Sequence, residues 1–428
     1  MTFLADLFRR RAVSPAEPAS PIQEQGQLAR FTQFADVLQG VHPLSFAAGG
    51  AGGPETRLNV LVPWLSPRGM SGGPNTLLNL AYRIARKGLP VRFVSTDLPK
   101  EDDEGLWRHL AALTGIEERL PNVELACGYD RSKPLPAGRS EVFFASAWWN
   151  AQMIKRAGDR LGRKPFLYLI QDFEPGLYPW STQYALALET YGLDFEAIFC
   201  SGLLAEYFAL NRVGRFADPA FAARCARFEP AVDRTRFFPA QGARAGPRRL
   251  LFYARPTAAQ RNLFELGLFA LREAVAAGHF DGWELNFIGE NLPSVDLGRG
   301  LSIRPRGWMD YDEYAACVRG SDIMLALMLS PHTSYPPLEM AGSGGVAVTT
   351  CLANKSRERL SAISPGIIGV APTVEGVVAG LAEASARIAS GTRGGGLEGV
   401  PGSWDEAFAP VLDRIEAMVA RCAAGEAA

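Results

Sequence analysis

The sequence predicts an α/β protein with two doubly wound parallel sheets, one in each half of the chain. The first observation is the length, because 428 residues is about three times a typical domain of roughly 150 residues. The second is the composition, since 47% apolar and 21% charged residues is the balance of a folded soluble protein. The third is an alternation of strand and helix patterns that restarts after a Pro-, Gly- and Arg-rich stretch at 239–248.

Charge and cysteine content exclude several classes of protein. The 44 Lys and Arg residues and 45 Asp and Glu residues give a net charge of −1, so no overall basic field is available for a nucleic-acid partner. The six cysteines form no Cys-x-x-Cys pair, which indicates reduced thiols in a cytoplasmic protein and no structural zinc. No apolar run approaches the roughly 18 residues of a membrane span, so an integral membrane protein is not expected.

Residues 1–54 are predicted to be an N-terminal extension and linker. Apolar residues near the start share one helical face and precede three arginines, whereas an export signal carries its positive charge first. Residues 1–11 therefore fit either a peripheral anchor on the inner face of the membrane or a frayed terminus. The Gly-rich stretch 47–54 precedes a strand, so it is no dinucleotide fingerprint.

The first domain is predicted over residues 55–240. Its apolar strands are expected at 58–62, 91–95, 142–145, 166–170 and 197–200, and a helix at 74–86. A strand, a helix and a second strand in this order imply a parallel crossover.

The second domain is predicted over residues 248–400. Strands are expected at 250–254, 284–288, 323–326 and 346–349, and helices at 263–275, 311–319 and 337–341. A last helix at 404–419, within 401–428, is expected to return and pack on the first domain. Because ligands of open α/β sheets bind at the carboxyl ends of the strands, we expect the two domains to face a shared cleft.

Two arginines follow the strand at 250–254. Arg255 and Arg261 lie six positions apart where a helix begins, and guanidiniums beside a helix N-terminus suit a diphosphate. The alternative is that they stabilise a strand end by pairing with surface carboxylates.

A carboxylate follows the strand at 323–326. The segment SPHTSYPPLEMAGSGG puts Pro336 and Pro337 at a helix start and Glu339 in the first turn. A carboxylate there can accept hydrogen bonds from a vicinal diol such as a ribose. The alternative is a glutamate that complements the helix dipole without a ligand.

Glycines and carboxylates follow two strands of the first domain. Gly72 and Gly73 end the 69–73 loop, where a glycine backbone lets a ligand approach closely or simply forms a tight turn. Asp172 and Glu174, in the tract QDFEP, are expected to emerge into the cleft as catalytic groups, with helix capping or a surface position as the alternative.

Three further groups of residues allow both a functional and a structural role. Trp148 and Asn150 are candidates for an acceptor wall, with core packing as the alternative for Trp148. Asp310 and Asp312 resemble a metal-binding Asp-x-Asp pair, but they precede a helix and are predicted to cap it. The four histidines show no pairing suited to a metal, and His332 is expected to be a satisfied loop residue, with contact to a ligand beside Glu339 as the alternative.

The tracts FYARP, QDFEP and SYPPLEMAGSGG resemble those of glycosyltransferases of the GT-B fold, family 4. They are most similar to bacterial rhamnosyltransferases of S-layer and rhamnan glycan synthesis, the WsaF-like group. The resemblance covers roughly residues 58–419 and is most specific in the second domain. It implies two Rossmann-like domains facing across a cleft, a nucleotide-sugar donor in the C-terminal domain, an acceptor in the N-terminal domain, and retention of anomeric configuration.

The resemblance also implies donor-binding residues, which by position are Arg255, Arg261, Gly307, Trp308, Tyr335, Pro336, Leu338 and Glu339. Among these, the arginines match the diphosphate pair, Glu339 matches the ribose ligand, and the turn at 307–309 matches the one that meets the nucleobase. This chain has Pro331 where many relatives carry a glutamate that contacts the donor sugar. A 6-deoxy sugar, which lacks one hydroxyl, is compatible with that loss.

The expected function is therefore transfer of a deoxyhexose, L-rhamnose from dTDP-L-rhamnose, to a growing bacterial surface polysaccharide or lipid-linked oligosaccharide. No metal and no cofactor are expected. Two alternatives are a non-hydrolysing sugar-nucleotide epimerase, which needs acid and base groups around the sugar, and a non-catalytic sugar-nucleotide-binding module, which would bind without turnover.

Overall fold

The computed structural model describes residues 41–47, 56–66, 72–137, 140–161, 164–240, 246–255, 259–289, 292–307, 309–392, 394–397 and 399–425. The predicted membrane contact of residues 1–11, Trp308 and most of the 69–73 loop lie outside these ranges. Within the predicted extension, β1 (Phe46–Ala47) pairs with β5 (Leu135–Pro136), and Leu44 is buried in the core of the first half. Residues 41–47 therefore belong to the folded first half, which corrects their assignment to the extension.

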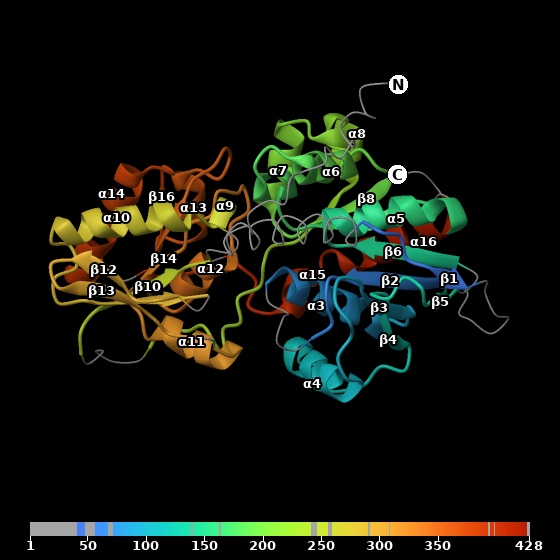
Figure 1. Cartoon of the computed structure of the whole chain (residues 1–428), viewed down its shortest axis with the longest axis horizontal. Coiled ribbons are helices and arrows are strands. Elements are labelled where there is room, and N and C mark those ends of the chain that lie inside the picture. The colour runs from blue at the N-terminus through green and yellow to red at the C-terminus, as the bar shows by residue number, and fades with distance from the viewer. Residues whose placement is uncertain are drawn as a thin grey trace, which may run out of the picture.

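A parallel sheet forms the centre of the first half (Figure 1). Its strand order is β4-β3-β2-β6-β7-β8-β9. Its strands are β2 (Thr56–Val62), β3 (Val91–Ser95), β4 (Val123–Cys127), β6 (Ser140–Ala145), β7 (Phe166–Ile170), β8 (Phe195–Phe199) and β9 (Ala226–Arg227). Its helices are α3 (Gly73–Arg86), α4 (Asp103–Thr114), α5 (Trp148–Leu161), α6 (Thr182–Thr190), α7 (Gly202–Leu210) and α8 (Pro219–Arg224), with short 3-10 turns η1 (Glu174–Leu177) and η2 (Gly214–Ala217). The pairing is parallel throughout, as the crossover pattern predicts.

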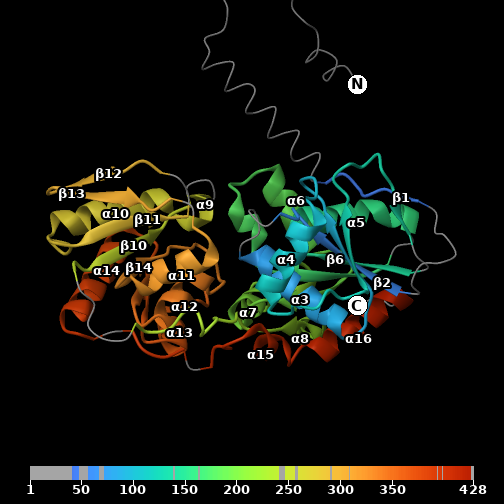
Figure 2. The ribbon, with the colours of Figure 1, turned by 90° about the horizontal axis from the view of Figure 1, so that it is seen from below.

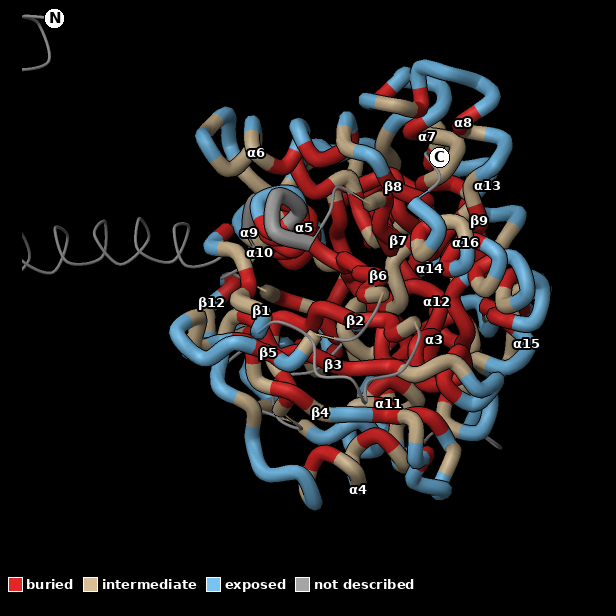
Figure 3. The backbone as a smooth tube through the Cα atoms, turned by 90° about the vertical axis from the view of Figure 1, so that its right-hand side faces the viewer, coloured by how far each residue is buried: buried red, intermediate tan, exposed pale blue. Residues whose placement is uncertain are grey.

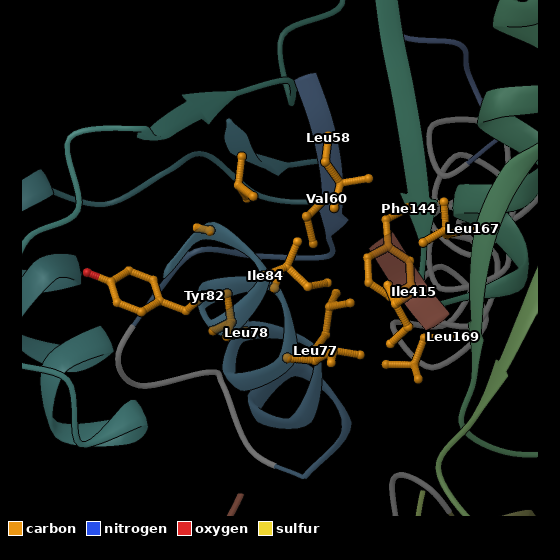
Figure 4. Packing of buried hydrophobic residues seen from close by; sticks show 14 of the residues in the cluster. Leu58, Val60, Leu77, Leu78, Tyr82, Ile84, Phe144, Leu167, Leu169 and Ile415 are labelled. Atoms are coloured by element: carbon orange, nitrogen blue, oxygen red, sulfur yellow. The ribbon is translucent and has the colours of Figure 1, made fainter. Parts of the chain in front are cut away.

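The strands of this sheet are apolar because helices cover both of its faces. All five residues of β7 and of β8 are buried, and the tube in Figure 3 is red along the central strands and pale blue along the outer helices. Helix α3 carries Leu77, Leu80 and Ile84 at helical spacing, and these side chains are fully buried. Figure 4 shows how side chains from α3, β2, β6 and β7 meet in this core.

The second half has a sheet of the same kind, in the order β12-β13-β11-β10-β14-β15-β16. Its strands are β10 (Arg249–Tyr253), β11 (Glu284–Ile288), β12 (Val295–Gly298), β13 (Leu301–Pro305), β14 (Ile323–Leu325), β15 (Val346–Thr350) and β16 (Ile367–Val370). Its helices are α9 (Ala259–Asn262), α10 (Phe264–Ala276), α11 (Tyr311–Arg319), α12 (Tyr335–Gly342), α13 (Arg357–Ile363) and α14 (Val374–Ala389). The edge strand β12 is antiparallel to β13, and the other pairs are parallel.

The C-terminal segment returns to the first half, as predicted, but as two helices. These are α15 (Trp404–Phe408) and α16 (Leu412–Ala424). The single helix predicted at 404–419 is broken at Pro410, because proline has no N–H to donate within a helix and its ring clashes with the preceding turn. Phe408 and Ile415 are buried in the core of the first half, and Figure 2 shows this segment running from the second half along the first. No helix within the described ranges is both long and apolar enough to cross a bilayer.

Candidate functional site

The two halves meet at the carboxylate of Asp172. This residue follows the buried strand β7, and its side chain is almost fully buried although it comes from the carboxyl edge of the sheet. One carboxylate oxygen accepts a hydrogen bond from Nη1 of Arg261 in α9, and the other accepts one from the hydroxyl of Ser330. The backbone N–H of Phe173 donates to the same oxygen as Ser330, at 2.8 Å. Asp172 is thus bound by two side chains from the second half.

The loop that supplies Ser330 has a defined shape between β14 and α12. The hydroxyl of Ser330 accepts from the backbone N–H of His332 at 3.0 Å, and Nδ1 of His332 accepts from the N–H of Ser334 at 2.9 Å. Ser334 has a φ of 71°, a left-handed conformation that is strained for a residue other than glycine. This strained residue immediately precedes α12, so it marks the change from the loop to the helix.

Glu174 does not share the position of Asp172. Its carboxylate accepts from the hydroxyl of Tyr168 at 3.1 Å and from the backbone N–H of Trp148, the first residue of α5. Burial raises the pKa of Glu174 to about 8, although both of these hydrogen bonds lower it. The expectation that both carboxylates emerge between the halves is therefore corrected, because Glu174 turns into the aromatic core of the first half and caps a helix.

Arg255 and Arg261 both lie at the carboxyl edge of the second sheet, but their surroundings differ. The Arg255 side chain lies beside Gly289, where a Cβ would come within 3.3 Å of its Cγ. Gly289 has a φ of 115°, which favours glycine. The guanidinium of Arg261 instead points across to Asp172. Any anion that binds Arg261 must therefore compete with a carboxylate.

Glu339 is bound by a tyrosine that no sequence motif indicates. The hydroxyl of Tyr314, in α11, donates to the Glu339 carboxylate at 2.6 Å. Burial raises the pKa of Glu339 to about 7, and the hydrogen bond from Tyr314 opposes that rise. Because α12 begins at Tyr335, Glu339 lies in its second turn, which corrects the prediction of a first-turn position. The ring of Tyr314 stacks on that of Tyr311, which fixes its direction.

A second contact between the halves involves the predicted glycine loop. The hydroxyls of Tyr335 and Thr76 lie 2.6 Å apart, and the Thr76 hydroxyl also donates to the carbonyl of Gly72. A Cβ on Gly73 would lie 2.4 Å from the side-chain oxygen of Gln171. A larger residue at Gly73 would therefore require the Gln171 side chain to move.

The remaining predicted donor residues fall into core and turn positions. Pro336 and Leu338 are buried in the first turns of α12, and Leu338 packs in the core of the second half. Gly307 has a φ of 74° in the turn before α11. Trp308 beside it lies outside the described residues.

The predicted acceptor wall is packed inside the first half. Nε1 of Trp148 donates to the hydroxyl of Tyr178 at 2.9 Å, and its ring lies in a buried cluster. Asn150 is fully buried, and its Nδ2 donates to Thr96 at 3.3 Å. For Trp148 this is the core alternative, and the same packing corrects the acceptor-wall placement of Asn150.

Asp310 caps α11, as predicted. Its side chain accepts from the backbone N–H of Glu313 at 2.8 Å, and the Glu313 side chain accepts from the Asp310 N–H at 3.1 Å. Asp312 pairs with Arg236 at 2.7 Å. Within the described part of the chain, no group of three or more His, Cys, Asp and Glu residues is arranged to hold a metal ion.

Comparisons with known proteins agree with this architecture. The chain matches the model of the WsaF N-terminal domain over residues 57–200 and that of the WsaF C-terminal domain over residues 248–382. It is 35% identical over 263 residues to the O-antigen biosynthesis protein RfbC of Myxococcus xanthus, an alignment that covers 58% of this chain and 18% of that protein. The chain thus matches less than a fifth of the length of this curated relative.

Two solved structures show the same fold. HepE from Anabaena, in complex with UDP and glucose, has a TM-score of 0.53 and 12% identity, and the alignment covers 85% of this chain and 99% of the HepE chain. WaaG, a glycosyltransferase involved in lipopolysaccharide biosynthesis, has a TM-score of 0.51 and 11% identity, and the alignment covers 79% of this chain and 92% of WaaG. These likenesses confirm the predicted GT-B fold class, with two Rossmann-like sheets.

Glu174→Gln is expected to remove part of the pH dependence of stability. Because the pKa of Glu174 is raised to about 8, above about 4.3 in an unfolded chain, the folded state binds the proton more tightly. This stabilisation is complete below about pH 4 and is lost as the pH rises through about 8. Urea unfolding at pH 5 and pH 8.5 should show a larger loss of unfolding free energy for the natural protein than for the variant.

The matched control for this experiment is Glu117→Gln, at an exposed position. It should keep the pH dependence of the natural protein. Equal losses in the natural protein and in Glu174→Gln would contradict the buried, protonated state of Glu174.

Proposed function

Because the chain belongs to the WsaF family, we propose that it is a glycosyltransferase of bacterial surface-polysaccharide synthesis that transfers L-rhamnose from dTDP-L-rhamnose. The acceptor is a growing polysaccharide or a lipid-linked oligosaccharide, the reaction retains anomeric configuration, and no divalent metal takes part. The name of the Myxococcus xanthus relative, an O-antigen biosynthesis protein, supports the pathway class. The observation that carries the proposal is the contact of Asp172 with Arg261 and Ser330 between the carboxyl edges of two parallel sheets.

The donor side of the proposal rests on residues of the second half. Arg255 and Arg261 bind the diphosphate, where guanidiniums replace a metal ion as the counter-charge. Glu339 accepts from the ribose hydroxyls while Tyr314 holds its other side. Pro331 stands in the strained loop before α12, and an apolar side chain there suits a sugar that lacks its 6-hydroxyl.

The acceptor side of the proposal rests on Asp172. When the donor diphosphate binds the guanidinium of Arg261, the carboxylate of Asp172 loses its ion pair with Arg261 and lies beside the reacting sugar. It can then accept a hydrogen bond from the acceptor hydroxyl or stabilise positive charge at the anomeric carbon. Positioning and electrostatics account for this role, so no covalent attack by Asp172 is required.

A panel of nucleotide sugars tests the proposed donor. At 100 times its Kd, a ligand that binds the folded state stabilises it by about 2.7 kcal/mol, so dTDP-L-rhamnose should raise the melting temperature more than UDP-glucose does. Transfer to a glycan acceptor should proceed equally in EDTA and in Mg²⁺. A preference for UDP-glucose would contradict the rhamnosyl assignment, and activity lost in EDTA would contradict metal independence.

Asp172→Asn should lower kcat by about 100-fold or more, the scale of a lost positioned polar catalyst. Asparagine keeps the size of the side chain and one acceptor oxygen, so the Ser330 hydrogen bond can persist. Glu174→Gln is the matched control, because its carboxyl is already buried and protonated at neutral pH, and it should keep kcat within about twofold. Steady-state kinetics separates the two, and a normal kcat in Asp172→Asn would contradict the catalytic role.

A further inference from the structure

Lys355 is the buried lysine of this chain. The sequence has six lysines, all within the described residues, and Lys355 is the one with 0% exposure. It lies in a tight turn after β15, where Leu352 and Lys355 exchange backbone hydrogen bonds and Ala353 has a φ of 48°. The neighbouring Asn354 donates from Nδ2 to the carbonyl of Leu203 in the first half, at 2.8 Å. Burial of an ammonium group is costly, so its contacts need an explanation.

The ammonium of Lys355 binds the loop that carries Ser330. Nζ donates to the carbonyls of Met328 at 3.0 Å and His332 at 3.3 Å, on either side of Ser330. The hydroxyl of Thr350 also donates to the Met328 carbonyl at 2.9 Å and accepts from the Met328 N–H at 3.1 Å. Lys355 therefore draws the two ends of the 328–332 segment together, and Ser330 at the middle of the segment points to Asp172.

The charged and titratable groups around Lys355 come from four elements. Asp172 follows β7, Arg261 comes from α9, Cys351 follows β15, and His332 belongs to the bound loop. Burial lowers the pKa of His332 to about 4 and raises that of the Cys351 thiol, so both are uncharged at neutral pH. Two cations, Lys355 and Arg261, then surround one carboxylate. Burial lowers the pKa of Lys355 to about 8, and the charge of Asp172 opposes this shift.

We propose that Lys355 is a positioning residue for sugar transfer, whose charged ammonium holds the 328–332 loop so that Ser330 orients the carboxylate of Asp172. This proposal rests on the glycosyltransferase activity proposed above. A charged donor forms hydrogen bonds roughly twice as strong as a neutral one. Loss of the proton therefore loosens the loop without unfolding it, and the orientation of Asp172 is lost with it.

The pH profile of kcat tests this role, since a merely structural lysine would not set it. In the natural protein kcat should fall above about pH 8. In Lys355→Met, kcat at pH 7 should be about 10-fold lower than in the natural protein, the cost of roughly one charged hydrogen bond. The decrease in kcat above about pH 8 should be absent from this variant. The control is Lys155→Met at an exposed ion pair with Glu189, which should keep the natural profile. If Lys355→Met has the same kcat and the same pH dependence of kcat as the natural protein, the proposal is overturned.

A second measurement is independent of turnover. In protein labelled at its six lysines, nuclear magnetic resonance should show one signal that titrates near pH 8 and is missing in Lys355→Met. In Asp172→Asn the same signal should titrate at lower pH, because a carboxylate that favours the charged form has been removed. An unchanged midpoint would overturn the link between Lys355 and Asp172. If this link is found but no donor or acceptor supports turnover, the proposed function fails instead.

Discussion

The contact of Asp172 with Arg261 and Ser330 is the constraint that organises this molecule. Three segments meet at this contact. They are the carboxyl end of β7 in the first half, and α9 and the loop between β14 and α12 in the second half. Neighbouring contacts bridge the halves as well, including the hydroxyl pair of Thr76 and Tyr335. A buried carboxylate without its charged partner would be strongly unfavourable. The ion pair therefore couples the relative position of the halves to the electrostatics of the site.

Three carboxyl groups near the carboxyl edges of the strands have different surroundings, and these surroundings separate their roles. Asp172 faces a guanidinium, whereas Glu174 and Glu339 are each bound by a tyrosine hydroxyl in a buried position. Burial raises the pKa of Glu174 to about 8 and that of Glu339 to about 7. Among the three, Asp172 is the carboxyl group that contacts side chains of the other half, and it is the one to which we assign the proposed catalytic role.

The sequence predicts the central strands well and the edges poorly. Strands such as β7 and β11 were predicted because helices cover both faces of each sheet, which leaves continuous apolar runs. Strands β4, β12 and β13, at or next to the edge of a sheet, were missed because exposed residues interrupt their apolar runs, and the short buried edge strand β16 was missed as well. The pattern at 404–419 is apolar at helical spacing on both sides of Pro410, so periodicity alone joined two helices into one.

The site could be predicted only in part, because its contacts join residues far apart in the sequence. Position after a strand is enough to single out Asp172, Arg261 and Glu339 as candidates. It cannot show that Glu174, two residues after Asp172, turns into the core, or that Tyr314 supports Glu339. Lys355 was missed because a lone lysine after an apolar strand is expected to lie on the surface, as most lysines do. A lysine in the short turn at the carboxyl end of a fully buried strand is the signal that could have found it.

The most direct test of this account is a double-mutant cycle on the affinity for dTDP, measured by calorimetry. If the donor diphosphate and Asp172 compete for Arg261, Asp172→Asn should tighten dTDP binding by about fivefold, the equivalent of roughly 1 kcal/mol. In an Arg261→Ala background the same substitution should have no effect on dTDP affinity. Weaker dTDP binding in Asp172→Asn, by the same factor in both backgrounds, would contradict the exchange of partners at Arg261.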